Sequence, residues 1–179
     1  MQMKKIIKLT LVLAMMLGAT TVSAQKLARI NTQEVFALMP ETAEMQKNLE
    51  AFGKDLQEQI EQIQVEFNNK YAEFQKNQAT MAESIKQMKQ QELEQLQQRY
   101  SEFQQIAQQD FQKKQQELAT PIQEKLSAAI GKVAKAGGYA VVFDTSIPTM
   151  AYIDEAQATD LAPAVKKELG ISESATPVQ

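Results

Sequence analysis

The chain of 179 residues contains no histidine, cysteine or tryptophan. Without imidazole or thiolate groups it cannot build a zinc finger, a Cys-His dyad or a Ser-His-Asp triad. It can neither form a disulfide nor carry a lipid on cysteine. It also lacks the G-x-x-x-x-G-K-[ST] and G-x-G-x-x-G loops that bind nucleotide phosphates. These absences argue against an enzyme and against a bound metal or organic cofactor.

Residues 1–24 have the pattern of a secretory signal peptide. Three lysines precede an apolar stretch at Leu9–Gly18, and residues 22–24 are small or modest in size, as a signal peptidase requires. The stretch of about 10 strongly apolar residues is well short of the roughly 20 needed to span a bilayer. We therefore expect cleavage after Ala24 and export, most simply into a bacterial periplasm.

The net charge limits which partners the protein is expected to bind. Loss of the three leader lysines leaves 16 Lys+Arg against 22 Asp+Glu, a mature net charge of 16 − 22 = −6. The basic residues are dispersed among acidic ones, so we expect no nucleic-acid binding and no strong membrane binding. The carboxylate clusters Glu92-x-Glu94, Asp154-Glu155 and Asp160 have no histidine beside them, so we interpret them as solvated rather than catalytic or metal-binding.

A long helical segment occupies the middle of the chain. Between Glu41 and Thr120 there is no proline and only one glycine, Gly53, and apolar residues recur at steps of three and four. This spacing predicts a helix with one apolar stripe. Residues 77–84 form the weakest helix-forming stretch, which predicts a reversal there and two antiparallel arms. The stripe comprises Met45, Leu49, Phe52, Leu56, Ile60, Ile63, Phe67, Tyr71, Phe74, Met81, Ile85, Met88, Leu93, Leu96, Tyr100 and Phe103.

Strand patterns lie at both ends of the mature chain. Leu27–Ile30 and Tyr139–Phe143 are β-branched or apolar runs that predict strands, and Met150–Ile153 predicts another. Thr120 followed by Pro121 resembles an N-cap with proline in the first turn, which predicts that the second arm is kinked or restarts there. Short helices are expected before Pro40 and over Leu161–Leu169.

The predicted fold class is mainly α with a small β body. The body comprises residues 25–40 and 121–170, the inserted helical hairpin comprises 41–120, and residues 171–179 form a polar tail expected to be disordered. A body of about three strands buries little core and leaves sheet edges open. We therefore expect the chain to associate with copies of itself through the strands.

The order of several segments resembles the Skp/OmpH family of periplasmic chaperones. The resemblance spans about Lys26 to Gly170. It rests on the segments Lys26–Asn31, Pro121–Lys125, Gly137–Asp144 and Asp160–Leu169, arranged behind a signal peptide and around a glutamine-rich hairpin. It implies a homotrimer with a central β body and three helical arms that enclose a cavity for unfolded outer-membrane proteins. It places Ile30, Val141 and Phe143 in the body strands. Val142 lies between the last two residues in sequence.

The residues alone leave several roles open. Phe74, Met81, Ile85 and Met88 lie nearest the expected tip, where client contact is favoured because few neighbours of the same chain cover them and methionine adapts to varied partners. Packing between the arms is the alternative for every stripe residue. Gly53 is either a hinge that widens the cavity or a site of close packing between the arms. Residues 45–120 hold nine Lys+Arg against twelve Asp+Glu, so a basic wall that attracts lipid or lipopolysaccharide is not expected.

The alternative function belongs to another class of protein. A structural coiled-coil spacer or adaptor with a fixed periplasmic partner would show the same stripe. Such a spacer would bury both arms continuously, whereas a holdase chaperone needs spare apolar surface. The exposure of apolar side chains on the arms therefore separates the two functions.

Overall fold

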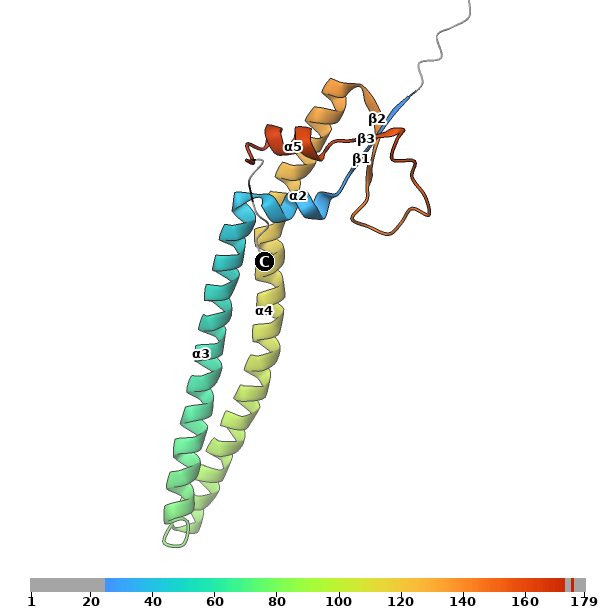
Figure 1. Ribbon diagram of the computed structural model, residues 1–179. Helices are drawn as coiled ribbons and strands as arrows, with labels where there is room; N and C mark the ends of the chain where they lie inside the picture. Colours follow the sequence, from blue (N-terminus) through green and yellow to red (C-terminus); the bar gives the residue numbers. More distant parts are fainter. Residues whose placement is uncertain (1–24, 173–174, 176–179) are drawn as a thin grey trace, which may run out of the picture.

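A computed structural model describes residues 25–172 and Ala175. The predicted signal peptide and most of the predicted disordered tail lie outside the described residues. In chain order the elements are β1 (Lys26–Ile30), α2 (Thr32–Leu38), α3 (Pro40–Asn77), α4 (Glu83–Gly137), β2 (Tyr139–Asp144), β3 (Ala158–Asp160) and α5 (Ala162–Glu168). The molecule has a small body at one end, from which α3 and most of α4 project together (Figure 1).

The predicted antiparallel hairpin is present, and α3 and α4 form its two arms. Helix α3 has 38 residues, which corresponds to a length of about 57 Å at 1.5 Å per residue. The chain reverses between Asn77 and Glu83, inside the range predicted from sequence. In this turn the backbone N–H and the hydroxyl of Thr80 both donate to the Asn77 carbonyl. Local bonds, one of them from a side chain, thus replace helical backbone bonds where the residues have weaker helix propensity.

The prediction that the second arm restarts at Pro121 is wrong. Helix α4 runs for 55 residues with Pro121 inside it. Thr120 is not an N-cap, because its hydroxyl donates to the Gln116 carbonyl, one turn earlier, at 2.8 Å. Proline removes one backbone donor from a helix, but packing of the flanking turns can offset that loss. Here Ile122 and Leu126, which follow the proline within α4, are buried in the body core.

The sheet has three strands in the order β2-β1-β3, and β1 is parallel to both neighbours. The long hairpin supplies the connection from β1 to β2. The predicted strand at Met150–Ile153 is wrong, because that segment lies in a loop and the third strand forms at Ala158–Asp160. The Asp154 carbonyl accepts the N–H groups of Gln157 and Ala158, so this turn, rather than local β propensity, selects which residues reach β1.

The core of the body joins both ends of the chain. Its largest fully buried side chains are Ile30, Met39, Val35 and Val165. They pack with the part of α4 that follows Pro121 and with Leu161 and Ala162 at the start of α5. Helix α4 ends at Gly137 and is capped by Gly138, whose φ of 70° is a left-handed conformation that favours glycine. This core fixes the base of the arms relative to the sheet.

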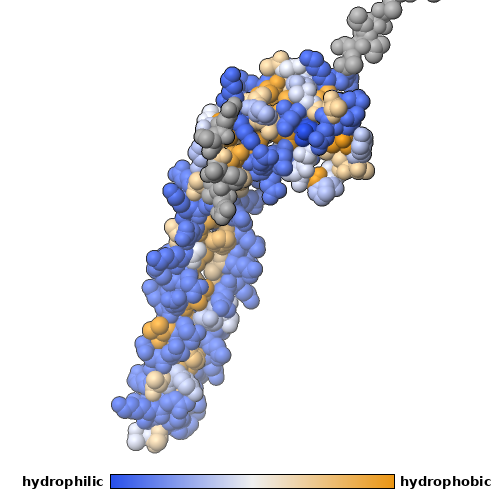
Figure 2. Space-filling view, viewed as in Figure 1, coloured by the Kyte–Doolittle hydropathy of each residue, from blue (hydrophilic) through white to orange (hydrophobic). Residues whose placement is uncertain are grey.

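The surface of the arms is mostly hydrophilic, with scattered apolar side chains (Figure 2). Across the described ranges, none of the helices has a stretch apolar and long enough to cross a membrane.

Candidate functional site

Packing between the arms uses only part of the predicted stripe. The buried side chains between α3 and α4 are Leu49, Ile63, Phe74, Leu96 and Ala107. They recur at helical spacing, and they form the seam between two amphipathic helices. Their burial favours the packing alternative at these positions. The remaining apolar residues of the arms are the candidates for contact with another molecule.

The four predicted tip residues differ in their exposure. Ile85 and Met88 are 43% and 53% exposed, and Met81 is half-buried. Phe74 is only 8% exposed, so it packs between the arms and does not offer the open surface that client contact requires. Client contact at Phe74 stays a prediction, and its burial on α3 favours the packing alternative. The accessible part of the tip consists of the other three residues.

Further exposed apolar residues lie along both arms. Val65, Tyr71 and Ile106 are 55%, 46% and 51% exposed. Val65 and Ile106 fall outside the stripe, so helical periodicity does not identify them. The signal that could have found them was an isolated apolar residue on a face otherwise made of Gln and Glu.

Three of these exposed residues share one side of α4. Met88 and Ile106 are 18 residues apart, which is five full turns at 3.6 residues per turn, and Ile85 lies three residues before Met88. The spacing places Met88 and Ile106 on one face about 27 Å apart. We call Ile85, Met88 and Ile106 the outer stripe. It presents separated apolar contacts along the arm instead of one closed pocket.

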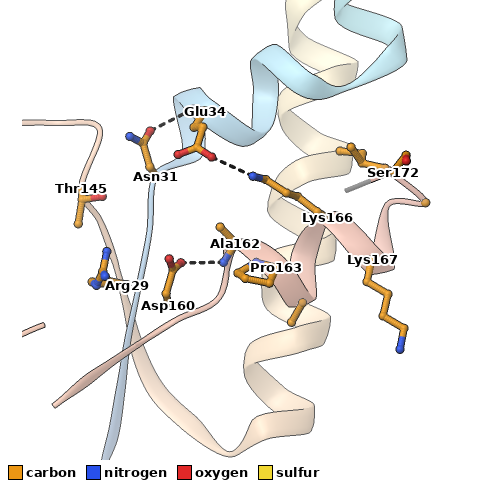
Figure 3. Close-up of a pocket in the computed structure, with 13 residues that line it drawn as sticks. Arg29, Asn31, Glu34, Thr145, Asp160, Ala162, Pro163, Lys166, Lys167 and Ser172 are labelled. Carbon is orange, nitrogen blue, oxygen red and sulfur yellow. Dashed lines mark hydrogen bonds and ion pairs between the residues drawn. The ribbon is translucent and has the colours of Figure 1, made fainter. Parts of the chain in front are cut away.

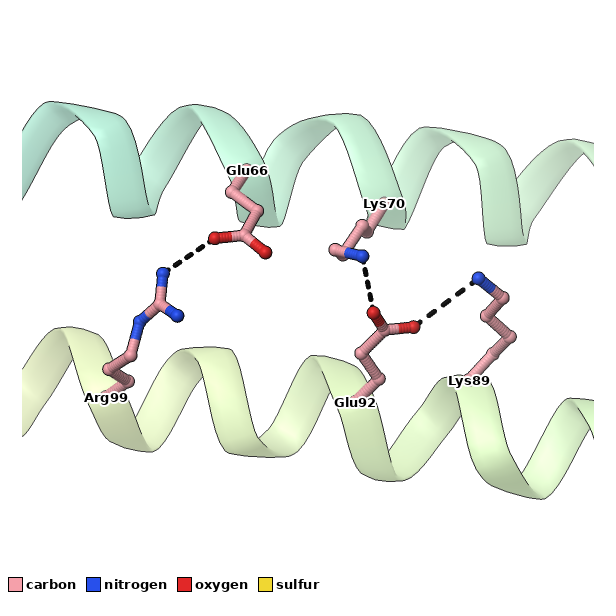
Figure 4. A network of polar contacts seen from close by, with 5 residues as sticks. All are labelled: Glu66, Lys70, Lys89, Glu92 and Arg99. Carbon is pink, nitrogen blue, oxygen red and sulfur yellow. Dashed lines mark hydrogen bonds and ion pairs between the residues drawn. The ribbon is translucent and has the colours of Figure 1, made fainter.

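A network of charged side chains bridges the outer half of the arms (Figure 4). The Arg99 guanidinium is 2.6 Å from a Glu66 carboxylate oxygen, and Lys70 donates to Glu92. Lys89 approaches the second Glu92 oxygen at 3.4 Å. The hydrogen bond from Lys70, followed by that from Lys89, holds the pKa of Glu92 below its ordinary value despite desolvation. The same contact raises the pKa of Lys70, so both groups stay charged at neutral pH.

Gly53 lies against the opposite arm. A Cβ atom added there would be 3.3 Å from Cε2 of Phe111, a contact that requires the ring to shift by a few tenths of an ångström. Helix α3 continues through this position without interruption. The contact supports the packing alternative, and the hinge stays a prediction.

The predicted assembly residues lie in two environments. Ile30 is 1% exposed and Val142 packs against the body core, so both support the fold of one chain. Val141 is 42% exposed on β2, an edge strand, and its register partner Leu27 is 37% exposed. Phe143 is half-buried on the same strand. The apolar residues available for association through the sheet are therefore Val141, Leu27 and the accessible part of Phe143.

Asp144 connects the end of β2 to the start of α2. Its carboxylate accepts bonds from the Thr32 hydroxyl at 2.6 Å and from the Ser146 hydroxyl and N–H at 2.7 and 2.9 Å. Burial raises the pKa of Asp144, but the bonds from Thr32 and Ser146 outweigh it and hold the pKa below the usual value. Asp144 thus stabilises the turn that follows β2 through Ser146 and links this turn to Thr32 at the start of α2.

A cavity of about 1130 Å³ opens between the sheet and α5 (Figure 3). Its polar groups bind one another: Lys166 contacts Glu34 at 2.8 Å, and Asp160 accepts the Ala162 N–H at 2.9 Å. Arg29 reaches Glu155 at 3.4 Å. These contacts hold α5 and the 145–157 loop on the sheet. Most of the charged side chains that line the cavity contact the protein itself, although the buried Nε of Arg29 has no hydrogen-bond partner among the described residues. The exposed apolar side chains of the arms make the arms the stronger candidate for a functional surface.

The remaining predicted carboxylates also have local partners. Asp154 accepts the Ala156 N–H at 3.0 Å, and Glu92 belongs to the network between the arms. Within the described residues, no group of three or more acidic side chains could hold a metal ion.

Comparisons of sequence and of structure show which known proteins this chain is similar to. Residues 26–169 match the sequence model of the family described as outer membrane protein (OmpH-like). The chaperone protein Skp of Yersinia enterocolitica is 25% identical over 152 residues, which cover 85% of this chain and 90% of Skp. A crystal structure from Caulobacter crescentus, described as an OmpH-like outer membrane chaperone, superposes with a TM-score of 0.69 at 13% identity. That match covers 90% of this chain and 94% of the other, and it establishes the similarity of fold. The family match over residues 26–169 shows that this protein belongs to the Skp/OmpH family.

Proposed function

We propose that the protein is an ATP-independent holdase chaperone of the periplasm. It binds unfolded outer-membrane proteins in a cavity between helical arms and prevents their aggregation. The relationship to Skp supports the class of activity. The observation that carries the proposal is that the arms retain exposed apolar residues after their seam is filled. A spacer with a fixed partner needs only the seam.

Each apolar contact of the outer stripe binds a client weakly, and several contacts together bind it strongly. Apolar burial gains about 25 cal/mol per Å², so a contact of about 40 Å² gives about 1 kcal/mol. Residues along several arms can act together, and the effective concentration of each further contact is high once the first has formed. Such binding fixes no single client conformation. This suits an unfolded chain whose apolar residues are spread over many segments.

Holdase activity can be measured by diluting a urea-unfolded β-barrel protein into buffer with and without this protein, in the absence of ATP. We expect suppression of light scattering. A triple variant, Ile85→Ser with Met88→Ser and Ile106→Ser, should suppress aggregation several-fold less well. The matched control is Gln87→Ser with Gln90→Ser and Gln105→Ser, which changes three exposed positions of the same helix. Equal protection by both variants would contradict the assignment of the surface, and no protection by the parent would favour the spacer.

The cavity requires more than one chain, and we propose a homotrimer joined through the body strands. Edge strand β2 presents apolar residues and no lysine or proline that would discourage pairing. Sedimentation equilibrium should give a mass near three mature chains. Val141→Asp should lower that mass, because it places a charge on the open part of β2. Val142 is unsuitable for this test because it packs in the core. A cooperative monomer at micromolar concentration would contradict the trimer.

A further inference from the structure

The middle of the arms is strongly acidic, whereas the tip is not. We call residues 55–69 of α3 and 93–110 of α4 the mid-arm. The two segments face each other, since the Glu66 carboxylate contacts the Arg99 guanidinium at 2.6 Å. Together they hold one basic residue against seven acidic ones, a net charge of 1 − 7 = −6. Residues 70–92, at the tip, hold four lysines against three glutamates, a net charge of 4 − 3 = +1.

Most of the mid-arm carboxylates have no basic partner. Arg99 binds Glu66, and Lys54 approaches Glu58 at 3.8 Å. The other five acidic residues make no ion pair among the described residues, and three of them accept side-chain hydrogen bonds only from glutamine. These five are Asp55, Glu61, Glu94, Glu102 and Asp110. A glutamine amide carries no net charge, so these bonds leave the negative charge of the surface uncompensated.

Exposed apolar residues lie directly beside these carboxylates. Ile106 of the outer stripe is 51% exposed, and on α4 it has Glu102 one turn before it and Asp110 one turn after it. Both carboxylates are exposed as well. On α3, Val65 is 55% exposed and borders a shallow groove of about 560 Å³ that is also lined by three glutamates of the same helix. Each exposed apolar residue of the mid-arm is therefore flanked by negative charge.

The spacing of these side chains on α4 matches that of an extended chain. Four residues of a helix rise by about 6 Å, so Glu102 and Asp110 lie about 6 Å along the axis on either side of Ile106. Residues two apart in an extended chain point to the same side and are about 6.7 Å apart. An extended segment that lies along α4 can therefore place an apolar side chain on Ile106 and a lysine or arginine at each carboxylate. The long apolar stems of these basic side chains pack on the helix while their charged ends reach the carboxylates.

We propose that the mid-arm is a selective docking surface for extended client segments in which an apolar residue lies between two basic residues, each two positions away. Ile106 contacts the apolar side chain, and Glu102 and Asp110 bind the basic ones. This selectivity rests on the proposed chaperone function. A second copy of this chain is a poor occupant, because its own mid-arm has the same negative charge. Apolar contact still sets the affinity for a whole unfolded client, which contains segments of both signs, and charge decides which of these segments occupy the mid-arm.

Binding of short peptides to the full mature chain tests the selectivity. The probes are fluorescent peptides that repeat Lys-Ser-Phe-Ser, Gln-Ser-Phe-Ser or Glu-Ser-Phe-Ser, and fluorescence anisotropy gives their affinities. At low salt we expect the lysine peptide to bind about three- to ten-fold more tightly than the glutamine peptide, the effect of two or three exposed ion pairs, and the glutamate peptide to bind least tightly. The difference should fall below about two-fold at about 0.5 M salt, because the charges are screened.

A fourth peptide tests the alignment along α4. It repeats Lys-Phe-Ser-Ser, which has the same composition as the lysine peptide but turns the lysines to the side of an extended chain opposite the apolar residue. We expect its affinity advantage over the glutamine peptide to be less than half that of the Lys-Ser-Phe-Ser peptide. An undiminished advantage would overturn the proposed alignment.

Variants of α4 locate the preference on the mid-arm. Glu102→Gln with Asp110→Asn should reduce the preference for the lysine peptide to less than about two-fold and leave the affinity for the glutamine peptide unchanged. Ile106→Ser should weaken the binding of both peptides. The matched control, Glu44→Gln with Glu124→Gln, removes two exposed carboxylates outside the mid-arm and should keep the full preference. Because both double variants change the net charge equally, equal effects of the two would overturn the docking surface.

The peptide results and the aggregation assay together separate this inference from the proposed function. Equal affinities of the lysine, glutamine and glutamate peptides for the parent, or binding of none of them, would overturn the selectivity even if the parent protects an unfolded β-barrel protein. A lysine preference that disappears in the Glu102→Gln, Asp110→Asn variant, in a protein that protects no unfolded chain, would support the docking surface and contradict the proposed function.

Discussion

The body and the arms bury their apolar residues to different extents. The four largest fully buried side chains, Ile30, Val35, Met39 and Val165, all belong to the body. In the arms, buried apolar side chains keep between 5% and 9% of their surface exposed. A core enclosed by a sheet and helices can exclude water, whereas two helices can enclose only one line of side chains. The stability of the chain is thus concentrated in the body, and the arms retain accessible apolar surface.

The largest expected effect tests this difference in burial. Ile30→Ala should lower the free energy of unfolding by about 3 kcal/mol, because it leaves a cavity in the body core. Leu96→Ala should cost about half as much, since its neighbours in the arms can relax around the smaller side chain. Chemical denaturation measures the free energy of unfolding of the whole chain. Hydrogen exchange shows whether the body or the arms open. Equal losses, with both parts opening together, would contradict the comparison.

A smaller effect on stability is expected for the carboxylate of Asp144, which links the end of β2 to the start of α2. The pKa of Asp144 is lower in the folded chain than in the unfolded one, so its contribution to stability is complete above the unfolded pKa of about 3.9. The contribution disappears as pH falls through the lower, folded pKa.

Asp144→Asn should therefore cost about 1 kcal/mol at neutral pH, a value reduced for the partial solvation of this site. Its stability should also depend less on pH than that of the parent between about pH 5 and pH 2. Asp110→Asn, at an exposed position of α4, serves as the control. Parallel pH profiles for the parent and Asp144→Asn would refute the role of the Thr32 and Ser146 bonds.

The smallest expected effect is at Gly53. Alanine improves a regular helix by about 0.5–1 kcal/mol, but its Cβ must displace the Phe111 ring, so Gly53→Ala should change stability by less than about 0.5 kcal/mol. Gly53→Leu should destabilise by about 1–3 kcal/mol through overpacking. Protection of large and small clients should be the same for Gly53→Ala and the parent. A selective loss for large clients would establish the hinge instead.

Regular patterns over long segments made most of the fold predictable. The three- and four-residue spacing of the apolar stripe, which includes Leu49, Ile63 and Leu96, predicted the two helices. The weak helix formers at 77–84 located the turn. Local patterns were less reliable where tertiary packing decides. Thr120-Pro121 resembles a helix start, yet the body core holds α4 continuous there. Ala158–Asp160 has little strand character, and the turn that begins at Asp154 brings it to β1.

The candidate surface was only partly predictable, for a related reason. Periodicity identifies residues that two helices bury against each other, so it selected Phe74, which is part of the seam. It says nothing of apolar residues outside the stripe, such as Ile106. The network from Glu66 to Arg99 requires knowledge of how the two arms align, which the sequence of one arm does not contain. Exposure in the folded chain was needed to separate packing from contact.

Client affinity as a function of salt tests most directly whether apolar contact captures clients. The affinity for an unfolded β-barrel protein should be measured from low to roughly half-molar salt, for the parent and for Met81→Ser with Ile85→Ser and Met88→Ser. We expect the parent affinity to be flat or to rise slightly, because screening weakens charge attraction but not apolar burial, and we expect the triple variant to bind several-fold more weakly. A steep loss of parent affinity with salt, together with an unaffected triple variant, would contradict apolar capture and assign binding to charge.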